Sequence, residues 1–283
     1  SSRDASCSQT FIGNESGQLL SPGYPENYTT SEFCNYAIQL PSNRQVNLTF
    51  TEVELERWNN SLVDFIVLFD GVDCMSQRIA AVVNISTPSY ISSGNSMVAL
   101  FTSDINTQTG AFAAKFTTVS RSEPVPPFPE NKILERCGED IKAINGKLLY
   151  EGKGGVNHLC IWRITVEYGK MLTFNLTKLS LSYPRNWLRI LDGSDCGAPV
   201  VYFANGDSEK RLVSLTSTTN TMMVIFAEIN GNGTDRIEAD YYMVSATPGS
   251  QSEGDVVSSE AGSKLISIAA TNLLLITAAR IYA

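Results

Sequence analysis

A short stretch that occurs twice governs how this chain of 283 residues can fold. The two copies are FIVLFDGVDC at Phe65–Cys74 and LRILDGSDC at Leu188–Cys196. Each is an apolar run that ends in Asp-Gly, with a cysteine three residues after the glycine. Asp-Gly after apolar residues is typical of a tight turn, because glycine accepts a positive φ angle. A single copy would mean little, but two copies predict an internal duplication.

Other landmarks recur in the same order around the two copies. Cys7 and Cys137 precede them and lie 130 positions apart. The apolar segments Asn95–Phe101 and Asn220–Phe226 follow them and begin 125 positions apart. The sequence therefore predicts two related domains of roughly 110 residues each, which is a usual domain size.

Composition along the chain divides it into five parts. We expect a first domain at 1–118, a linker at 119–136, a second domain at 137–246, a polar stalk at 247–264 and a hydrophobic tail at 265–283. Four prolines make the linker stiff and extended. Short apolar runs alternate with Gly, Asn and Ser turns throughout both domains. This pattern predicts an all-β protein built from two tandem sandwiches, with no helix before the tail.

Cysteine and asparagine usage indicate the secretory pathway. Six cysteines fall three per domain, which suits an oxidising compartment. The net charge of −8 argues against nucleic acid as a partner. Seven N-x-[ST] sequons are candidate glycosylation sites. They are Asn14, Asn27, Asn47, Asn59, Asn84, Asn175 and Asn232.

The C-terminal tail predicts attachment to a membrane through a lipid. Its apolar part, Leu265–Ala279, is short and interrupted by polar residues, whereas a membrane span needs about 20 apolar residues. A small-residue site, a polar spacer and an apolar tail are typical of a GPI-attachment signal, with Ser252 or Ser259 as the site. A transmembrane anchor or an amphipathic tail is the alternative. We expect a GPI-anchored protein at the cell surface, with a secreted form as the alternative.

The motifs of both domains resemble those of CUB domains, which are extracellular β-sandwich modules. SPGYPENY at Ser21–Tyr28 and F-x-S-D at Phe101–Asp104 match in the first domain, and C-x-W-x-I at Cys160–Ile164 matches in the second. The usual second disulfide of the family is disrupted, because one of its positions is missing and Cys74 and Cys196 stand early in place of the other. Two such domains with an apolar tail resemble the nematode CUB-like family.

The resemblance implies a disulfide pattern. Cys7–Cys34 and Cys137–Cys160 would be the family's first disulfide in each domain. Cys74 and Cys196 remain, at equivalent positions of the two repeats. A bridge between them would lock the two domains together, and the alternatives are an intermolecular disulfide or two buried thiols. Six cysteines allow 15 pairings, so the pairing rests on the resemblance alone.

The resemblance also implies one calcium site. Many CUB domains hold Ca²⁺ with a glutamate, an aspartate eight residues later and the aspartate of the S-D motif, and Glu56, Asp64 and Asp104 match these. Tyr28 would support these acids, and Asn106 would add an oxygen ligand. Three carboxylates supply the charge and the oxygens that Ca²⁺ prefers. Without a cation these clustered carboxylates would repel one another. The alternative is that they are solvated loop acids that bind no metal ion.

The second domain does not repeat this set. Ser180, Asn186 and Glu228 occupy the matching places, so only one of the three carboxylates is retained. We therefore expect one calcium ion, in the first domain. In CUB domains that bind calcium, an acid of the site can engage a lysine of a partner, and a similar role for Asp104 is a hypothesis here.

The sequence gives little support to catalysis. His158 is the only histidine, and no G-x-S-x-G, HExxH or P-loop motif is present. Trp162, in the C-x-W-x-I motif, is expected in the core. Trp58 and Trp187 lie in matching turns and are candidates for exposed contacts with a partner.

These observations predict a binding protein and not an enzyme. We expect an extracellular recognition glycoprotein that binds a protein or a glycan through a calcium-ordered first domain. Members of the nematode CUB-like family are secreted or surface proteins, many of them linked to innate responses, so the resemblance implies a role in defence against bacteria. The alternative is a developmental or gamete-surface adhesion protein. A hydrolase regulator or weak enzyme is disfavoured by the single histidine.

Overall fold

The computed structural model describes residues 7–58, 61–82, 89–105, 110–121, 134–152, 154–207, 211–229 and 233–245. Every helix or strand assigned within these ranges is a strand, so the expected all-β class is confirmed. No helix that could span a membrane is found in the same ranges. Residues 1–246 form one compact unit, whereas 247–283, with the predicted stalk and GPI signal, lie outside the described residues.

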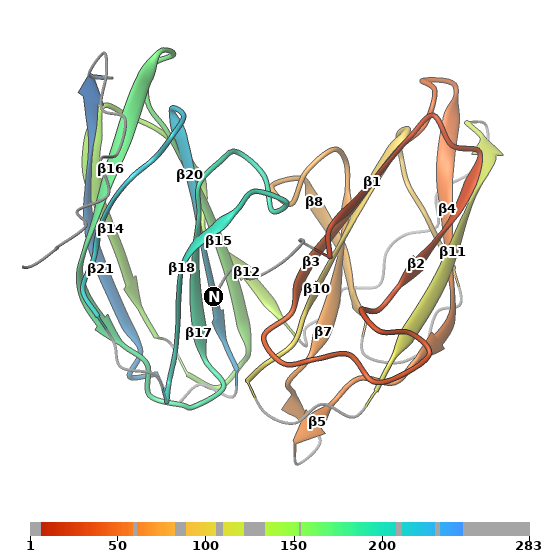
Figure 1. Ribbon diagram of the computed structural model, residues 1–283, viewed down its shortest axis with the longest axis horizontal. Coiled ribbons are helices and arrows are strands. Elements are labelled where there is room, and N and C mark those ends of the chain that lie inside the picture. Colours follow the sequence, from red (N-terminus) through yellow and green to blue (C-terminus); the bar gives the residue numbers. More distant parts are fainter. Residues whose placement is uncertain are drawn as a thin grey trace, which may run out of the picture. The chain divides into compact units, whose positions relative to one another are not determined.

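The first eleven strands form two main sheets, which we call the first sandwich (Figure 1). One sheet has the order β1-β3-β10-β7-β8, the other has the order β2-β11-β4-β9, and β5 and β6 form a short separate pair. The strands are β1 (Gln9–Ile12), β2 (Ser16–Leu20), β3 (Phe33–Gln39), β4 (Arg44–Val53), β5 (Arg57–Trp58), β6 (Ser61–Leu62), β7 (Phe65–Asp70), β8 (Gln77–Val82), β9 (Ser89–Ile91), β10 (Ser96–Thr102) and β11 (Phe112–Ser120).

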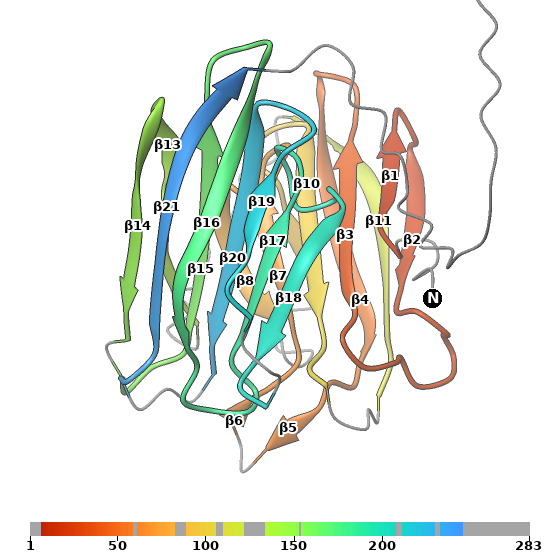
Figure 2. The same ribbon diagram turned by 60° about the vertical axis from the view of Figure 1, so that its left-hand side comes forward.

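The remaining ten strands form the second sandwich (Figure 2). One sheet has the order β12-β15-β20-β17-β18, with β13 also paired to β15, and the other has the order β14-β21-β16-β19. The strands are β12 (Glu135–Cys137), β13 (Asp140–Lys142), β14 (Asn145–Glu151), β15 (His158–Thr165), β16 (Lys170–Ser180), β17 (Trp187–Leu191), β18 (Val200–Asn205), β19 (Ser214–Thr216), β20 (Thr221–Glu228) and β21 (Arg236–Ser245). Apart from β5, β6 and the additional strand next to β15, this order repeats that of the first sandwich.

The apolar pattern of each strand reflects how many of its faces are covered. In β4, Val46, Leu48 and Phe50 alternate and point into the core of the first sandwich. In β7 the run Phe65–Phe69 is buried throughout. Its even-numbered residues belong to that core, whereas its odd-numbered residues belong to a separate cluster shared with the second sandwich. A strand that is covered on both faces needs a continuous apolar run, and the duplicated stretch supplies one.

The shared cluster joins the two sandwiches, and we call it the interface core. Val67 and Leu100 contribute to it from the sheet of β7 and β10. Trp187, Leu191 and Ile225 contribute from the sheet of β17 and β20. The two sandwiches therefore bury apolar sheet faces against each other, a contact that stabilises in proportion to the apolar area removed from water.

Three disulfide bonds connect the described cysteines. They are Cys7–Cys34, Cys137–Cys160 and Cys74–Cys196, the pairings considered from the sequence. The first two lie within single sandwiches. Cys74–Cys196 crosses the interface and joins residues 122 positions apart.

Candidate functional site

Three carboxylates meet at one end of the first sandwich. Asp64 immediately precedes β7 and Asp104 follows β10. These two strands are antiparallel, with Phe65 opposite Thr102, so the register brings both acids to the same edge. The backbone N–H of Asp104 donates a hydrogen bond of 2.9 Å to Oδ1 of Asp64. Glu56 approaches from the segment after β4 and is linked to Asp64 through Tyr28.

Asp64 is the buried centre of this group. Its side chain is fully inaccessible, and its Oδ2 accepts a hydrogen bond of 2.8 Å from the hydroxyl of Tyr28. That hydroxyl accepts a hydrogen bond of 3.1 Å from the backbone N–H of Glu56. Burial raises the pKa of Asp64 to about 7, although the hydrogen bonds from Tyr28 and from the Asp104 N–H oppose the rise. Burial likewise raises the pKa of Tyr28.

An arginine of the second sandwich contacts this group. Arg185 lies between β16 and β17, and its Nη1 is 2.5 Å from Oδ2 of Asp104 and 3.2 Å from Oε1 of Glu56. Both Asp104 and Arg185 are buried. The acid for which the sequence suggested a partner's lysine is therefore paired with an arginine of the same chain.

The residue types of this site fit a calcium ion. All the atoms that could bind a metal ion here are oxygen atoms, and Oε2 of Glu56 is buried without a hydrogen-bond partner. The oxygen atoms of these carboxylates are spaced more widely than the ligands of a formed metal site. Among the described residues, only Cys7, Glu32 and Cys34 bring three ligand atoms within 4.8 Å of one another. Those two cysteines form a disulfide and have no thiolate to offer.

The matching place of the second sandwich contains a hydrogen-bonded network. Asn186 is fully buried, and its amide donates to Oδ2 of Asp235 and accepts from the N–H of Ile229. Oε2 of Glu228 accepts a hydrogen bond from the hydroxyl of Tyr150. Ser180 lies at the end of β16. Sequence reasoning missed Asp235, because it directly precedes β21, where the first sandwich has Ala111 before β11 and no predicted ligand.

His158 has a buried structural environment. Its Nδ1 lies 3.2 Å from Oε2 of Glu228, and its Nε2 lies 3.4 Å from Oε2 of Glu135. The ring is thus held between two carboxylates, one fully buried and the other half-exposed.

The prediction that Trp187 is an exposed contact residue is wrong. Its side chain is 2% exposed and belongs to the interface core. The reason is that the turn before β17 faces the first sandwich, where Phe33 packs edge-on against the indole ring. Trp162 lies in the core of the second sandwich, as expected. The side chain of Trp58 lies outside the described residues, as does Asn106.

Arg189 is a second arginine of the interface that sequence reasoning missed. It is 2% exposed, and its guanidinium lies 4.3 Å from the ring centroid of Trp187. Phe33 and Phe203 each lie 4.8 Å away. Its Nη1 donates a hydrogen bond of 3.2 Å to Oγ1 of Thr102. A charged residue inside the run LRIL is the signal that was available, because burial of such a residue requires polar and aromatic contacts.

The sequons divide by position. Asn14 and Asn27 are exposed in turns, whereas Asn47 and Asn175 are partly buried on β4 and β16. The Oδ1 of Asn27 accepts a hydrogen bond of 3.0 Å from the N–H of Gly110. The other sequons lie outside the described residues, namely Asn59, Asn84 and Asn232.

Comparisons with known proteins agree with these motifs. The chain matches the family described as CUB domain over residues 7–116, and a CUB domain is therefore present. Residues of the chain are 37% identical to the bone morphogenetic protein 1 homolog of Strongylocentrotus purpuratus, over 37% of the chain and 17% of that protein. They are 27% identical to human Tolloid-like protein 2, over 70% of the chain and 19% of that protein. The chain thus spans less than a fifth of these relatives' length.

Solved structures give weaker matches. The CUB1-EGF-CUB2 domain of human MASP-1/3 covers 82% of the chain and is itself covered completely, with 16% identity and a TM-score of 0.34. The MASP-1 CUB2 domain bound to Ca²⁺ covers 39% of the chain and is covered to 99%, with 23% identity and a TM-score of 0.34.

Proposed function

We propose that the chain is a non-catalytic extracellular recognition glycoprotein whose first CUB domain binds one calcium ion. The observation that supports this most is the convergence of Glu56, Asp64 and Asp104 on one edge of the first sandwich, where the Tyr28 hydroxyl donates a hydrogen bond to Asp64. Buried carboxylates are costly unless cations or hydrogen bonds compensate them. Arg185 contributes one positive charge, and a divalent ion would compensate further.

The calcium ion would be bound by oxygen ligands of this group. Oε2 of Glu56 is available, since it accepts no hydrogen bond, and Asn106 would add a ligand if its segment approaches. Calcium accepts six to eight oxygens, so water would complete the set. Because Arg185 contacts two of the acids, calcium binding would be coupled to the contact between the sandwiches.

The remaining parts of the proposal concern organisation and setting. Residues 137–246 would be a second, diverged domain of the same kind, supported by the shared strand order of the two sandwiches. The tandem would resemble the nematode CUB-like family, which favours a role in innate defence against bacteria. The protein would reach the cell surface, carry glycans at its sequons and bind an extracellular protein or glycan. Its attachment would be a GPI anchor at Ser252 or Ser259, and release from cells by phospholipase tests this part.

Calcium titration by calorimetry tests the central claim. The full chain is compared with Asp64→Asn, which removes one ligand charge, and with Glu54→Gln, which removes an exposed charge two residues before Glu56. We expect one calcium ion per chain for the wild type and for Glu54→Gln, and none for Asp64→Asn. Absence of binding by the wild type, or equal binding by all three proteins, would contradict the calcium site.

A further inference from the structure

The Cys74–Cys196 disulfide lies between two equivalent turns. Asp73 and Asp195 each precede one of its cysteines. Oδ1 of Asp73 accepts the N–H of Met75 at 3.0 Å, and Oδ1 of Asp195 accepts the N–H of Gly197 at 2.7 Å. Both carboxylates are therefore held by the same local hydrogen bond, each on its own side of the disulfide.

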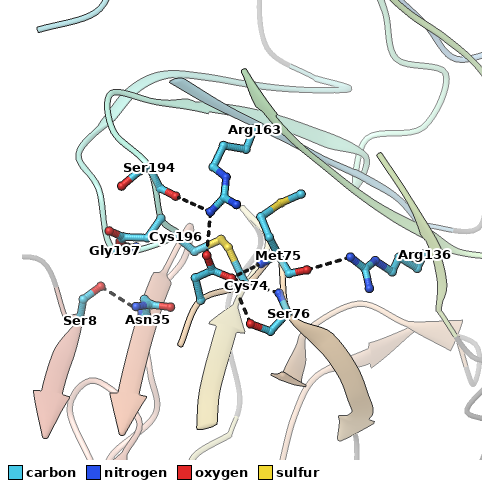
Figure 3. The surroundings of a disulfide bond; sticks show 12 residues. Ser8, Asn35, Cys74, Met75, Ser76, Arg136, Arg163, Ser194, Cys196 and Gly197 are labelled. Carbon is cyan, nitrogen blue, oxygen red and sulfur yellow. Dashed lines mark hydrogen bonds and ion pairs between the residues drawn. A yellow bond between two sulfur atoms is a disulfide. The ribbon is translucent and has the colours of Figure 1, made fainter. Parts of the chain in front are cut away.

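An arginine lies next to the carboxylate of Asp73. Nη1 of Arg163, on β15, lies 2.7 Å from Oδ2 of Asp73, across the interface. Figure 3 shows Arg163 next to the Cys74–Cys196 disulfide. Nη2 of Arg163 lies 2.6 Å from Oδ2 of Asp140, on the neighbouring strand β13. The hydrogen bonds with Asp140 raise the pKa of Arg163, so this guanidinium stays charged. Arg163 thus links an aspartate of each sandwich.

The strand register identifies the residues of the first sandwich that are equivalent to Arg163 and Asp140. Asp140 is opposite Arg163 in the parallel pair of β13 and β15, and Thr10 is opposite Ala37 in the parallel pair of β1 and β3. Arg163 and Ala37 each follow the strand's cysteine by three residues. Ala37 therefore stands where the second sandwich has Arg163, and Thr10 stands where it has Asp140.

A cavity lies at this place, where a small residue stands at the position equivalent to Arg163. Its volume is about 490 Å³, within the range of about 300–1,000 Å³ typical of ligand pockets. Ala37, Thr10, Asn35 and Asp195 line it, together with Asp73, whose Oδ2 is already paired with Arg163. Asn35 is 8% exposed, and its Oδ1 is buried without a hydrogen-bond partner. Figure 3 shows Asn35 beside Gly197, the residue that follows Cys196.

We propose that this cavity binds an arginine side chain of a protein partner. The guanidinium would pair with Asp195, as Arg163 pairs with Asp73 on the other side of the disulfide. Thr10 and Asn35 would accept its remaining N–H donors, and Ala37 and Val72 would contact its methylene groups. A guanidinium suits this place better than an ammonium, because it offers several donors in a fixed plane. The proposal names partner chemistry for the recognition function and does not depend on calcium.

Agmatine, a guanidinium on an alkyl chain, is a probe for this cavity. Its binding to the full chain is measured by NMR titration in the presence of a calcium chelator. We expect saturable binding that Asp195→Asn weakens about tenfold or more, the effect of losing one charged hydrogen bond. Asp207→Asn, which removes an exposed carboxylate elsewhere on the second sandwich, should leave binding unchanged. No binding by the wild type, or equal binding by Asp195→Asn, would overturn the proposal.

Ala37→Arg provides a second and independent measurement. It places an arginine at the position equivalent to Arg163, so the new side chain should fill the cavity and abolish agmatine binding. It should also raise the melting temperature in the wild-type background but not in the Asp195→Asn background, because the gain requires the new arginine to pair with Asp195. Retained agmatine binding by a folded Ala37→Arg variant contradicts the assignment. Loss of calcium binding by Asp64→Asn, with unchanged agmatine binding, separates this site from the calcium site.

Discussion

Nη1 of Arg185, in the second sandwich, donates a hydrogen bond of 2.5 Å to Oδ2 of Asp104, in the first sandwich. The same nitrogen lies 3.2 Å from Oε1 of Glu56. Two of the acids proposed as calcium ligands are thus in contact with another part of their own chain. The proposed ion site and the contact between the sandwiches share residues, and a change at one should be measurable at the other.

Removal of the Arg185 side chain tests this link. We expect Arg185→Ala to lower the free energy of unfolding of the calcium-free protein by about 3 kcal/mol, because it takes away the cation next to buried carboxylates. Calcium should then stabilise Arg185→Ala more than it stabilises the wild type. Thermal unfolding with calcium and with a chelator measures both effects. The exposed Arg211→Ala is the control, and an equal calcium effect in all proteins would argue against a shared site.

The disulfide across the interface should contribute strongly to stability. Cys74 and Cys196 are 122 positions apart, and in the chain-entropy model a loop of that length is worth about 4–5 kcal/mol. We expect Cys74→Ser combined with Cys196→Ser to lower the free energy of unfolding by an amount of this order in urea titrations. The interface core should remain intact, because its apolar contacts do not depend on the bond. Two separate unfolding transitions in the variant would show that the disulfide alone holds the sandwiches together.

The buried charge of Arg189 has a different expected role. Its guanidinium is enclosed by the rings of Phe33, Trp187 and Phe203. We expect Arg189→Met to change the free energy of unfolding by about 1 kcal/mol or less, because an apolar side chain of similar length avoids the cost of burying a charge. Arg189→Ala should cost about 2–4 kcal/mol, since it leaves a cavity between the rings. Equal losses in both variants would indicate that the charge itself is required.

The ion pair between Arg163 and Asp140 should make stability depend on acid pH. The hydrogen bond from Arg163 lowers the pKa of Asp140, although partial burial opposes this. A lowered pKa means that the stabilisation is present above the usual aspartate pKa of about 4 and is lost as pH falls through the lower folded value. The gain should be below about 1 kcal/mol, because the side chains are partly exposed. Thermal unfolding of wild type and Asp140→Asn should differ at pH 6 and converge near pH 2.

Local sequence patterns were sufficient for the fold class and for the strands. The alternation in β4 and the continuous run in β7 depend only on which faces are covered, and that property is written in consecutive residues. The order of motifs was also sufficient to bring Asp64 and Asp104 together, because both flank strands that pair in the CUB fold. The three disulfide pairings of the structure are those that the resemblance implied or left open.

Only the tertiary structure decided which surfaces of the two sandwiches meet. Trp187 was expected at the surface, yet it is buried, because the second sandwich packs that face against Phe33 of the first. Arg185 reaches Asp104 across 81 positions of sequence for the same reason. Contacts between sheet faces depend on the combined shape and polarity of many residues that are far apart in the sequence. A local hydrophobic pattern or motif does not predict them. The sequence by itself therefore determined the strands and the pairing of Asp64 with Asp104. The packing of one sandwich on the other determined which residues, such as Arg185, contact them across the interface.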